Sequence, residues 1–193
     1  MTYELPKSVS IRGKKLDIRS DFRAVLDIIA ALNDPELSEQ EKLAAAIEIF
    51  FINPEDIPHD GGQEAANAVM WFISGGTEDT GCKTARKVMD WEQDLSYIIA
   101  PVNRVLGCEI RERDYLHWWT FLSAYYEIGE CVFSNIVSLR IKKSKGKKLE
   151  TWEKDFYREN KSMIDLKERV SSAQLEKEHD IIEKIFAQNQ KIT

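Results

Sequence analysis

The sequence predicts a mainly α-helical protein, in which an N-terminal β-hairpin is followed by a multi-helix bundle and a charged C-terminal helix. Apolar residues alternate with polar ones on both sides of Gly13, which is the period of a half-buried strand. After residue 20, apolar residues recur at the spacing of an amphipathic helix. From residue 161 onward charged side chains are frequent and apolar ones are widely spaced, which is typical of a solvated helix.

The hairpin is expected to be centred on the glycine turn. Period-two patterning on both sides of such a turn is typical of two antiparallel strands. Two strands alone are marginally stable in water, so the hairpin must pack against the helices that follow. The alternating apolar residues are Val9 and Ile11 before the turn, and Leu16 and Ile18 after it.

Three short helices are expected after the hairpin. The first begins at an N-cap supplied by Ser20 or Asp21 and ends before Pro35. The second opens with a capping box formed by Ser38 and Glu41. The apolar stripes that define the three helices are Phe22, Val25, Leu26, Ile29 and Leu32; Leu43, Ile47, Phe50 and Phe51; and Ala65, Val69, Phe72 and Ile73.

A flexible connector is expected over residues 74–84, where Gly, Thr and acidic side chains are concentrated. Beyond it a long helix starts near Trp91 and stops at Gly107, a residue that favours helix C-termini. We therefore predict one helical domain over residues 1–160, which includes the hairpin. Residues 161–193 are predicted to form a charged C-terminal helix or tail.

A second helix in this half is expected to carry two adjacent tryptophans, Trp118 and Trp119, after an N-cap at Asp114 and an extended passage around Ile110. Neighbouring side chains on a helix point about 100° apart, so one indole can enter the core while the other faces a neighbour or a partner. Core packing is the favoured interpretation for these aromatic residues. Partner binding is the alternative, because aromatic side chains are enriched at binding hot spots.

The residue pattern predicts neither catalysis nor a metal or cofactor site. No H-x-x-x-H or C-x-x-C spacing occurs, and no glycine-rich phosphate-binding motif is present. Asp90 and Asp94 lie one turn apart, but paired carboxylates on a helix surface are usually solvated. His117 would need a cleft to act as a general base, and we favour a packed histidine beside the aromatic residues. The cysteines are far apart and are expected to be free thiols: Cys82, Cys108 and Cys131.

A basic run extends from Arg140 to Lys148 in a chain whose formal net charge is −6. It is interpreted as a solvated loop, as a contact for acidic groups, or as a nucleic-acid-binding module over residues 140–148. Coating of nucleic acid needs a surplus of Lys and Arg, so nucleic acid is the less favoured partner. No apolar segment approaches the ~18 residues that span a bilayer, so neither membrane insertion nor export is expected.

Four segments of the sequence carry a resemblance when they are taken together. They are the hairpin leading into residues 20–23, the acidic-aromatic start of the long helix at residues 90–94, the Leu-His-Trp-Trp-Thr-Phe segment at residues 116–121, and the basic run with Trp152 behind it. In these segments the chain resembles the bacteriophage gene-product-fifteen family of long-tailed phages and prophages of Gram-positive bacteria. The resemblance extends to about Arg158, and the double tryptophan is its most specific part.

The resemblance implies a role in phage tail morphogenesis. Members of this family look like tail-assembly chaperones that act in the cytoplasm of the bacterial host and are not retained in the mature virion. The expected partner is the tape-measure protein or another tail component, and the resemblance implies no catalytic residues, metal or cofactor. The candidate partner-binding residues are Trp118, Trp119, Tyr125, Tyr126, Lys142, Lys143, Lys147 and Lys148.

Overall fold

The computed structural model describes residues 4–77, 87–167 and 169–172. It confirms the mainly helical fold class with an N-terminal antiparallel hairpin. Of the predicted C-terminal helix, residues 161–164 are helical, and residues 173–193 lie outside the described part. The elements are β1 (Ser8–Ile11), β2 (Lys14–Asp17), α1 (Phe22–Leu32), α2 (Glu39–Phe50), η1 (Pro54–Asp56), α3 (Gly62–Ile73), α4 (Trp91–Leu106), η2 (Ile110–Glu112), α5 (Trp118–Tyr126), α6 (Val132–Ser144), α7 (Thr151–Glu159) and α8 (Lys161–Ile164).

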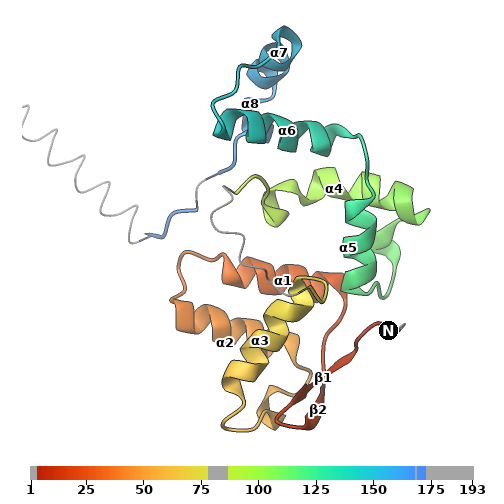
Figure 1. Ribbon diagram of the computed structural model, residues 1–193, viewed down its shortest axis with the longest axis vertical. Coiled ribbons are helices and arrows are strands. Elements are labelled where there is room, and N and C mark those ends of the chain that lie inside the picture. The colour runs from red at the N-terminus through yellow and green to blue at the C-terminus, as the bar shows by residue number, and fades with distance from the viewer. Residues whose placement is uncertain (1–3, 78–86, 168, 173–193) are drawn as a thin grey trace, which may run out of the picture.

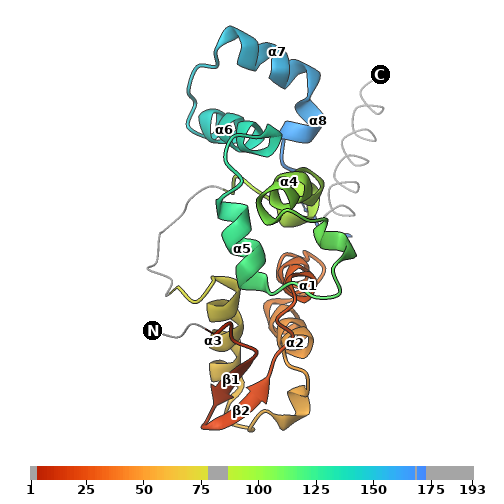
Figure 2. The ribbon, with the colours of Figure 1, turned by 90° about the vertical axis from the view of Figure 1, so that its right-hand side faces the viewer.

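The elements are stacked along the long axis of the molecule. Figures 1 and 2 show the hairpin with α2 and α3 at one end, and α6, α7 and α8 at the other. Helices α1, α4 and α5 lie between these two ends (Figure 2). Segments far apart in the chain therefore meet in the middle of the molecule.

The hairpin packs against the helices, as its marginal stability requires. β1 and β2 pair in antiparallel register, with Val9 opposite Leu16, and Gly13 at φ +77° supplies the turn conformation that glycine favours. Ile11 and Leu16 are buried in the core. The ladder continues beyond β2, where Ile18 bridges to Phe51 at the end of α2.

Local capping rules predict most helix starts correctly. Asp21 accepts a hydrogen bond from the Arg23 amide at the start of α1, and the capping box of α2 forms between Ser38 and Glu41. Gly107 ends α4 in the left-handed conformation at φ +68°. These contacts confirm the predicted boundaries.

The predicted start of α5 is wrong. The N-cap is His117, whose Nδ1 accepts from the Trp119 amide, and not Asp114. The reason is tertiary, because the chain before α5 pairs with the start of α1: the Phe22 amide donates to the Leu116 carbonyl at 2.9 Å. Ile110, expected in an extended passage, lies in the short helix η2 instead.

A single large core runs through the hairpin and helices α1 to α5. Trp118 is 1% exposed and stacks on Phe121, and its indole N–H donates to the Ile73 carbonyl at 2.9 Å. The indole N–H of Trp119 donates to the Phe72 carbonyl at 2.9 Å. A side chain at Gly76 would meet the Trp119 ring at 2.7 Å, so glycine is needed where the chain leaves α3. The double tryptophan thus joins α5 to the end of α3.

A buried ion pair joins the far end of the molecule to this core. Asp94 of α4 and Arg140 of α6 are 0% and 6% exposed, and two hydrogen bonds of 2.6 and 2.9 Å connect them. The same guanidinium donates to the backbone carbonyls of Val88, Met163 and Ile164. The interpretations of Asp94 as a surface charge and of Arg140 as part of a solvated run are therefore wrong. Their pairing depends on how α4 and α6 pack, which no local pattern shows.

We expect replacement of Trp118 by Ala to lower the free energy of unfolding by about 3–5 kcal/mol, because it empties a fully buried site. Urea denaturation followed by circular dichroism measures the loss. The control is Trp152→Ala, since Trp152 is 59% exposed on α7 and should change stability little. Equal effects of the two substitutions would contradict the core assignment.

The substitution Asp94→Asn should cost about 3–5 kcal/mol of stability, because it leaves the buried Arg140 charge without its partner. The double variant Asp94→Leu/Arg140→Met should recover most of this loss, since apolar residues can replace a buried ion pair. Chemical denaturation of the single and double variants tests both statements. A double variant less stable than Asp94→Asn would show that the hydrogen bonds of Arg140 to the backbone matter more than its charge.

Candidate partner-binding groove

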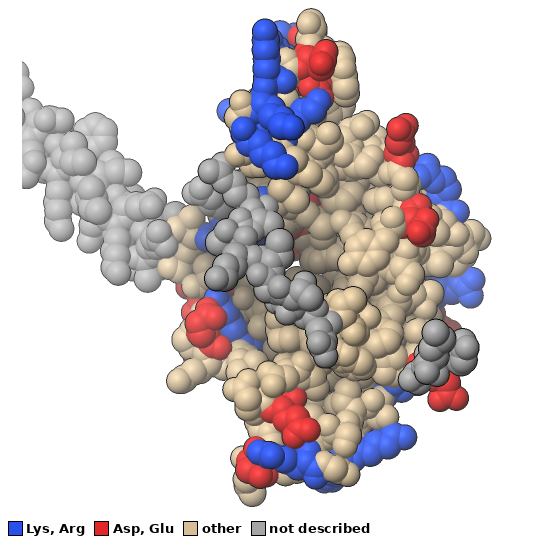
Figure 3. Space-filling view, viewed as in Figure 1, with Lys and Arg blue, Asp and Glu red and all other residues tan. Residues whose placement is uncertain are grey.

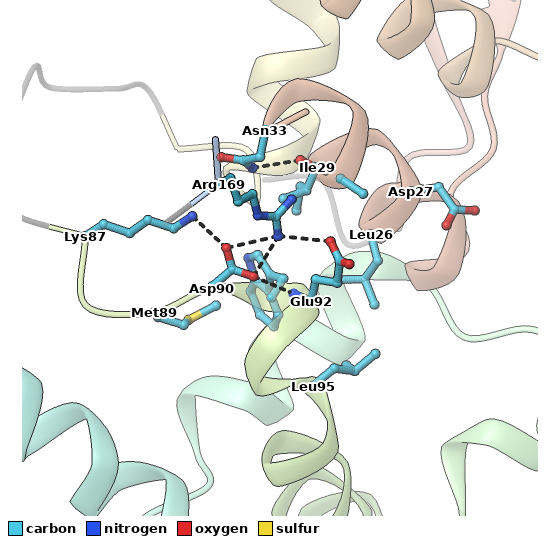
Figure 4. Close-up of a pocket in the computed structure, with 12 residues that line it drawn as sticks. Leu26, Asp27, Ile29, Asn33, Lys87, Met89, Asp90, Glu92, Leu95 and Arg169 are labelled. Carbon is cyan, nitrogen blue, oxygen red and sulfur yellow. Dashed lines mark hydrogen bonds and ion pairs between the residues drawn. The ribbon is translucent and has the colours of Figure 1, made fainter. Parts of the chain in front are cut away.

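A groove opens between α1 and α4, beside the described residues that follow α8. It holds a cavity of about 200 Å³. Its walls are apolar side chains that also touch the main core, so they are half-buried rather than free. Figure 4 shows Asp90, Glu92 and Arg169 between the apolar side chains of α1 and those at the start of α4. The apolar lining consists of Leu26, Ile29 and Ala30 from α1, and Met89, Trp91 and Leu95 from the start of α4.

The groove exists because two helices carry apolar stripes wider than the core requires. In α1, Val25 and Ile28 are fully buried, and Leu26 and Ile29 follow each of them on the adjoining face. A helix turns about 100° per residue, so this pair lies at the edge of the buried stripe. In α4, Trp91 and Leu95 are one turn apart and form the opposite wall. The half-buried side chains on these two helices form the apolar lining of the groove.

The rim of the groove carries an ionised carboxylate at the N-cap of α4. Asp90 accepts hydrogen bonds of 3.0 Å from the amides of Glu92 and Gln93, and one of 2.6 Å from Lys87. Arg169 donates to the same carboxylate at 2.8 and 3.0 Å. Burial opposes ionisation, but these donors outweigh it and lower the pKa of Asp90 to about 2. Asp90 is therefore ionised at neutral pH, and its charge is paired with those of Lys87 and Arg169.

Polar contacts bind the residues after α8 to the start of α4 and to the turn after α1. The side-chain amide of Gln93 makes both contacts with the start of α4. Its Nε2 donates to the Asp165 carbonyl at 2.9 Å, and its Oε1 accepts from the backbone amide of Lys167 at 3.0 Å. Farther along, the Ser172 hydroxyl donates to Glu36, in the turn after α1, at 2.7 Å. The chain thus passes from the start of α4 to the end of α1.

The structure separates the aromatic residues predicted to bind a partner. Trp118 lies in the core and offers no surface, and the Trp119 ring packs against Trp71 and Phe72. The Tyr125 hydroxyl donates to the Met89 sulfur at 3.0 Å, and burial raises the pKa of Tyr125 to about 12. Tyr126 is 71% exposed. Of these four aromatic candidates, Tyr126 alone keeps most of its surface.

The basic candidates lie at the end of the molecule formed by α6 and α7, where Figure 3 shows Lys and Arg side chains gathered. Lys142 forms an ion pair with the buried Glu153, and Lys143 with Asp165. Lys147 and Lys148 are exposed. Two of the four lysines predicted to bind a partner therefore form ion pairs within the protein, which weakens the interpretation of this segment as a nucleic-acid-binding module.

His117 uses both ring nitrogens in structural contacts. Its Nδ1 accepts from the Trp119 amide at 3.0 Å, so Nε2 carries the proton and donates to the Pro6 carbonyl at 2.9 Å. The side chain is buried beside Phe72, in keeping with the packed histidine favoured from the sequence. Burial lowers the pKa of His117 from its ordinary value of 6.5.

Other reactive groups add no site in the described ranges. Cys108 and Cys131 are free and half-buried, and Cys82 lies outside the described residues. Within residues 4–77, 87–167 and 169–172 no three His, Cys, Asp or Glu side chains are grouped as metal ligands would be. No helix in this part of the chain has the length and apolar character needed to cross a membrane.

The sequence interpretation did not identify the groove. The sequence pattern places Leu26 and Ile29 in the apolar stripe that faces the core. That stripe is wider than one buried helix face needs, which is the indication of a second apolar surface. For Arg169 no indication existed, because it is one of many charged residues near the C-terminus. Its partner Asp90 is 79 residues away in the sequence.

Fold and groove define a mainly helical protein that begins with a β-hairpin and leaves an apolar groove between α1 and α4. A family model described as Bacteriophage Gp15 protein matches residues 1–166. The chain belongs to this bacteriophage family, which confirms the resemblance seen in its sequence. No curated protein and no solved structure matches the chain. Both walls of the groove lie within the matched residues, whereas Arg169 lies beyond them.

The depressed pKa of His117 predicts a pH-dependent stability. The unfolded chain binds a proton at this residue at higher pH than the folded chain does, so the free energy of unfolding should fall as the pH drops below about 6.5. Above that pH the titration of His117 should add nothing to the pH dependence of the free energy of unfolding. The substitution His117→Asn keeps an N-cap acceptor and removes the titration, so its stability should change less between pH 7 and 5. Urea denaturation across this range measures both slopes, and equal slopes would contradict the assignment.

Proposed function

We propose that this phage protein is a non-enzymatic factor of tail morphogenesis, and that it acts as an assembly chaperone. In this proposal the α1–α4 groove binds an apolar helical segment of the tape-measure protein or of another tail component. The observation that carries the proposal is the half-buried apolar lining of the groove in a member of a bacteriophage family. Action in the host cytoplasm and absence from the finished virion belong to the same proposal.

A helix laid in an apolar groove is a common mode of protein recognition. A cavity of about 200 Å³ suits the anchoring apolar side chains of such a helix, with its polar side chains left to face the charged rim. A long apolar chain waiting to be packed into a tail tube exposes surface that aggregates, and a groove of this kind would cover part of it. The formal charge of −6 would keep the complex in solution.

A binding role agrees with the chemistry of the described residues. His117, which the sequence left as the candidate base, has no ring nitrogen free for a substrate. Of the residues first considered for partner binding, Tyr126, Lys147 and Lys148 retain exposed surface and remain candidates for secondary contacts. They lie on α5 and beyond α6, outside the groove lining.

Co-expression with the tape-measure protein of the same phage tests the proposal. The wild-type chain should increase the soluble fraction of that protein and co-purify with it. The double variant Leu26→Gln/Leu95→Gln should abolish both effects, because it places amides on both walls of the groove. Its matched control is Val105→Gln, which changes a 39% exposed residue on the outer part of α4 and should leave binding intact.

The wall residues also touch the core, so thermal unfolding must show that the double variant folds. If it does not, the single substitutions Leu26→Gln and Leu95→Gln take its place. Unchanged capture of the tape-measure protein by a folded groove variant would overturn the assignment of the groove. No gain in solubility with the wild-type chain would overturn the chaperone role.

A further inference from the structure

The described chain has a firm anchor at the end of α8 and a weaker extension after it. Ile164 is fully buried, and its carbonyl accepts from the buried Arg140 guanidinium. Asp165 pairs with Lys143 and accepts from the Tyr157 hydroxyl at 2.8 Å. Farther on, residues 169–172 contact the buried side chain of Asp90 and the exposed side chain of Glu36. We name residues 169–172 the latch.

The latch holds on mainly by charge. Arg169 is 27% exposed in its side chain and forms ion pairs with Asp90 at 2.8 Å and with Glu92 at 3.0 Å. Ser172 reaches the exposed carboxylate of Glu36. Partly exposed ion pairs are weak, because water and salt screen them and long side chains lose entropy in forming them. The pair with Glu92 is of this kind. The Asp90 side chain is 7% exposed, but it keeps Lys87 and two backbone amides as donors when Arg169 leaves, so the latch can be released without disturbing the core.

Arg169 is also part of the groove lining. Figure 4 shows its side chain between the end of α1, at Asn33 and Ile29, and the start of α4. The charged residues that line the groove are three acids, Asp27, Asp90 and Glu92, and two bases, Lys87 and Arg169. Without Arg169, three carboxylates would face a single ammonium group. The open groove thus combines apolar walls with an excess of negative charge.

We propose that Arg169 holds the place of a basic side chain of the partner, and that the latch must be displaced when the groove is filled. The inference rests on the proposed function of the groove and specifies the chemistry of its ligand. The partner segment is an amphipathic helix with an apolar face flanked by Lys or Arg. Its cation replaces Arg169 at Asp90, so this buried carboxylate keeps a second cationic partner beside Lys87 when the latch leaves.

Two labelled synthetic peptides test the proposal with the full chain. Both are amphipathic helices with the same leucine face, and one carries Lys and the other Glu on its polar face. Fluorescence anisotropy at low salt measures their Kd values. The Lys peptide should bind the wild-type chain, and about ten times more tightly to Arg169→Ala, because a competing internal ligand has been removed. The Glu peptide should bind neither chain measurably.

Two controls separate the latch from general charge effects. Arg158→Ala removes an arginine that is 74% exposed and paired with Asp155 on α7, and it should leave the Kd unchanged. Asp90→Asn keeps the helix cap but removes the charge, and it should abolish the preference for the Lys peptide. A Kd for Arg169→Ala equal to or weaker than that of the wild type would overturn the latch, and so would equal binding of the two peptides.

Failure of the latch and failure of the groove give different results. If Leu26→Gln/Leu95→Gln, which keeps every charge, binds the Lys peptide as the wild type does, the groove itself is wrong and the latch falls with it. If that variant loses binding while Arg169→Ala shows no gain, the groove stands and the latch is wrong. Binding lost in the groove variant and strengthened by Arg169→Ala supports both.

Discussion

The ion pair between Asp94 and Arg140 is the constraint on which the rest of the structure depends. It joins α4 to α6 in the buried interior, and Arg140 also donates to the carbonyls of Met163 and Ile164 at the end of α8 and of Val88 before α4. Asp94 Oδ2, which accepts from Arg140, also accepts from the Asp90 amide at 2.9 Å. The Asp94 carboxylate therefore positions both the end of the molecule formed by α6, α7 and α8 and the start of α4, which forms the rim of the groove.

A second set of contacts fixes α1, which forms the wall of the groove opposite α4. The chain entering α5 pairs with the start of α1, with the Trp118 amide donating to the Ser20 carbonyl at 2.8 Å. His117 caps α5 and bonds to the segment before β1, so three distant parts of the chain meet at one residue. A groove between two helices held in this way has walls that are already in place, which reduces the ordering cost of binding.

Much of the fold followed from the sequence because it depends on neighbours within one or two turns. The capping box at Ser38, the cap at Asp21 and the glycine stop at Gly107 are satisfied by backbone groups next to them. The predicted start of α5 is wrong because its capping residue is selected by pairing with the start of α1. That contact joins Asp21 to His117, which are 96 positions apart in the sequence. The partner-binding candidates stay a prediction, and which of them keep exposed surface could not be read from the sequence, since the exposure of Trp118 or Lys142 depends on what packs against it.

The sequence by itself determined the helical class, the hairpin and the membership of a bacteriophage family, because periodicity, caps and short motifs are local properties of the chain. Only the tertiary structure decided that Asp94 and Arg140 form a buried pair, that the double tryptophan belongs to the interior, and that α1 and α4 leave an apolar groove beneath Arg169. These outcomes depend on the relative placement of helices, which is set by the summed packing of many distant side chains and by the high cost of burying a charge without its partner.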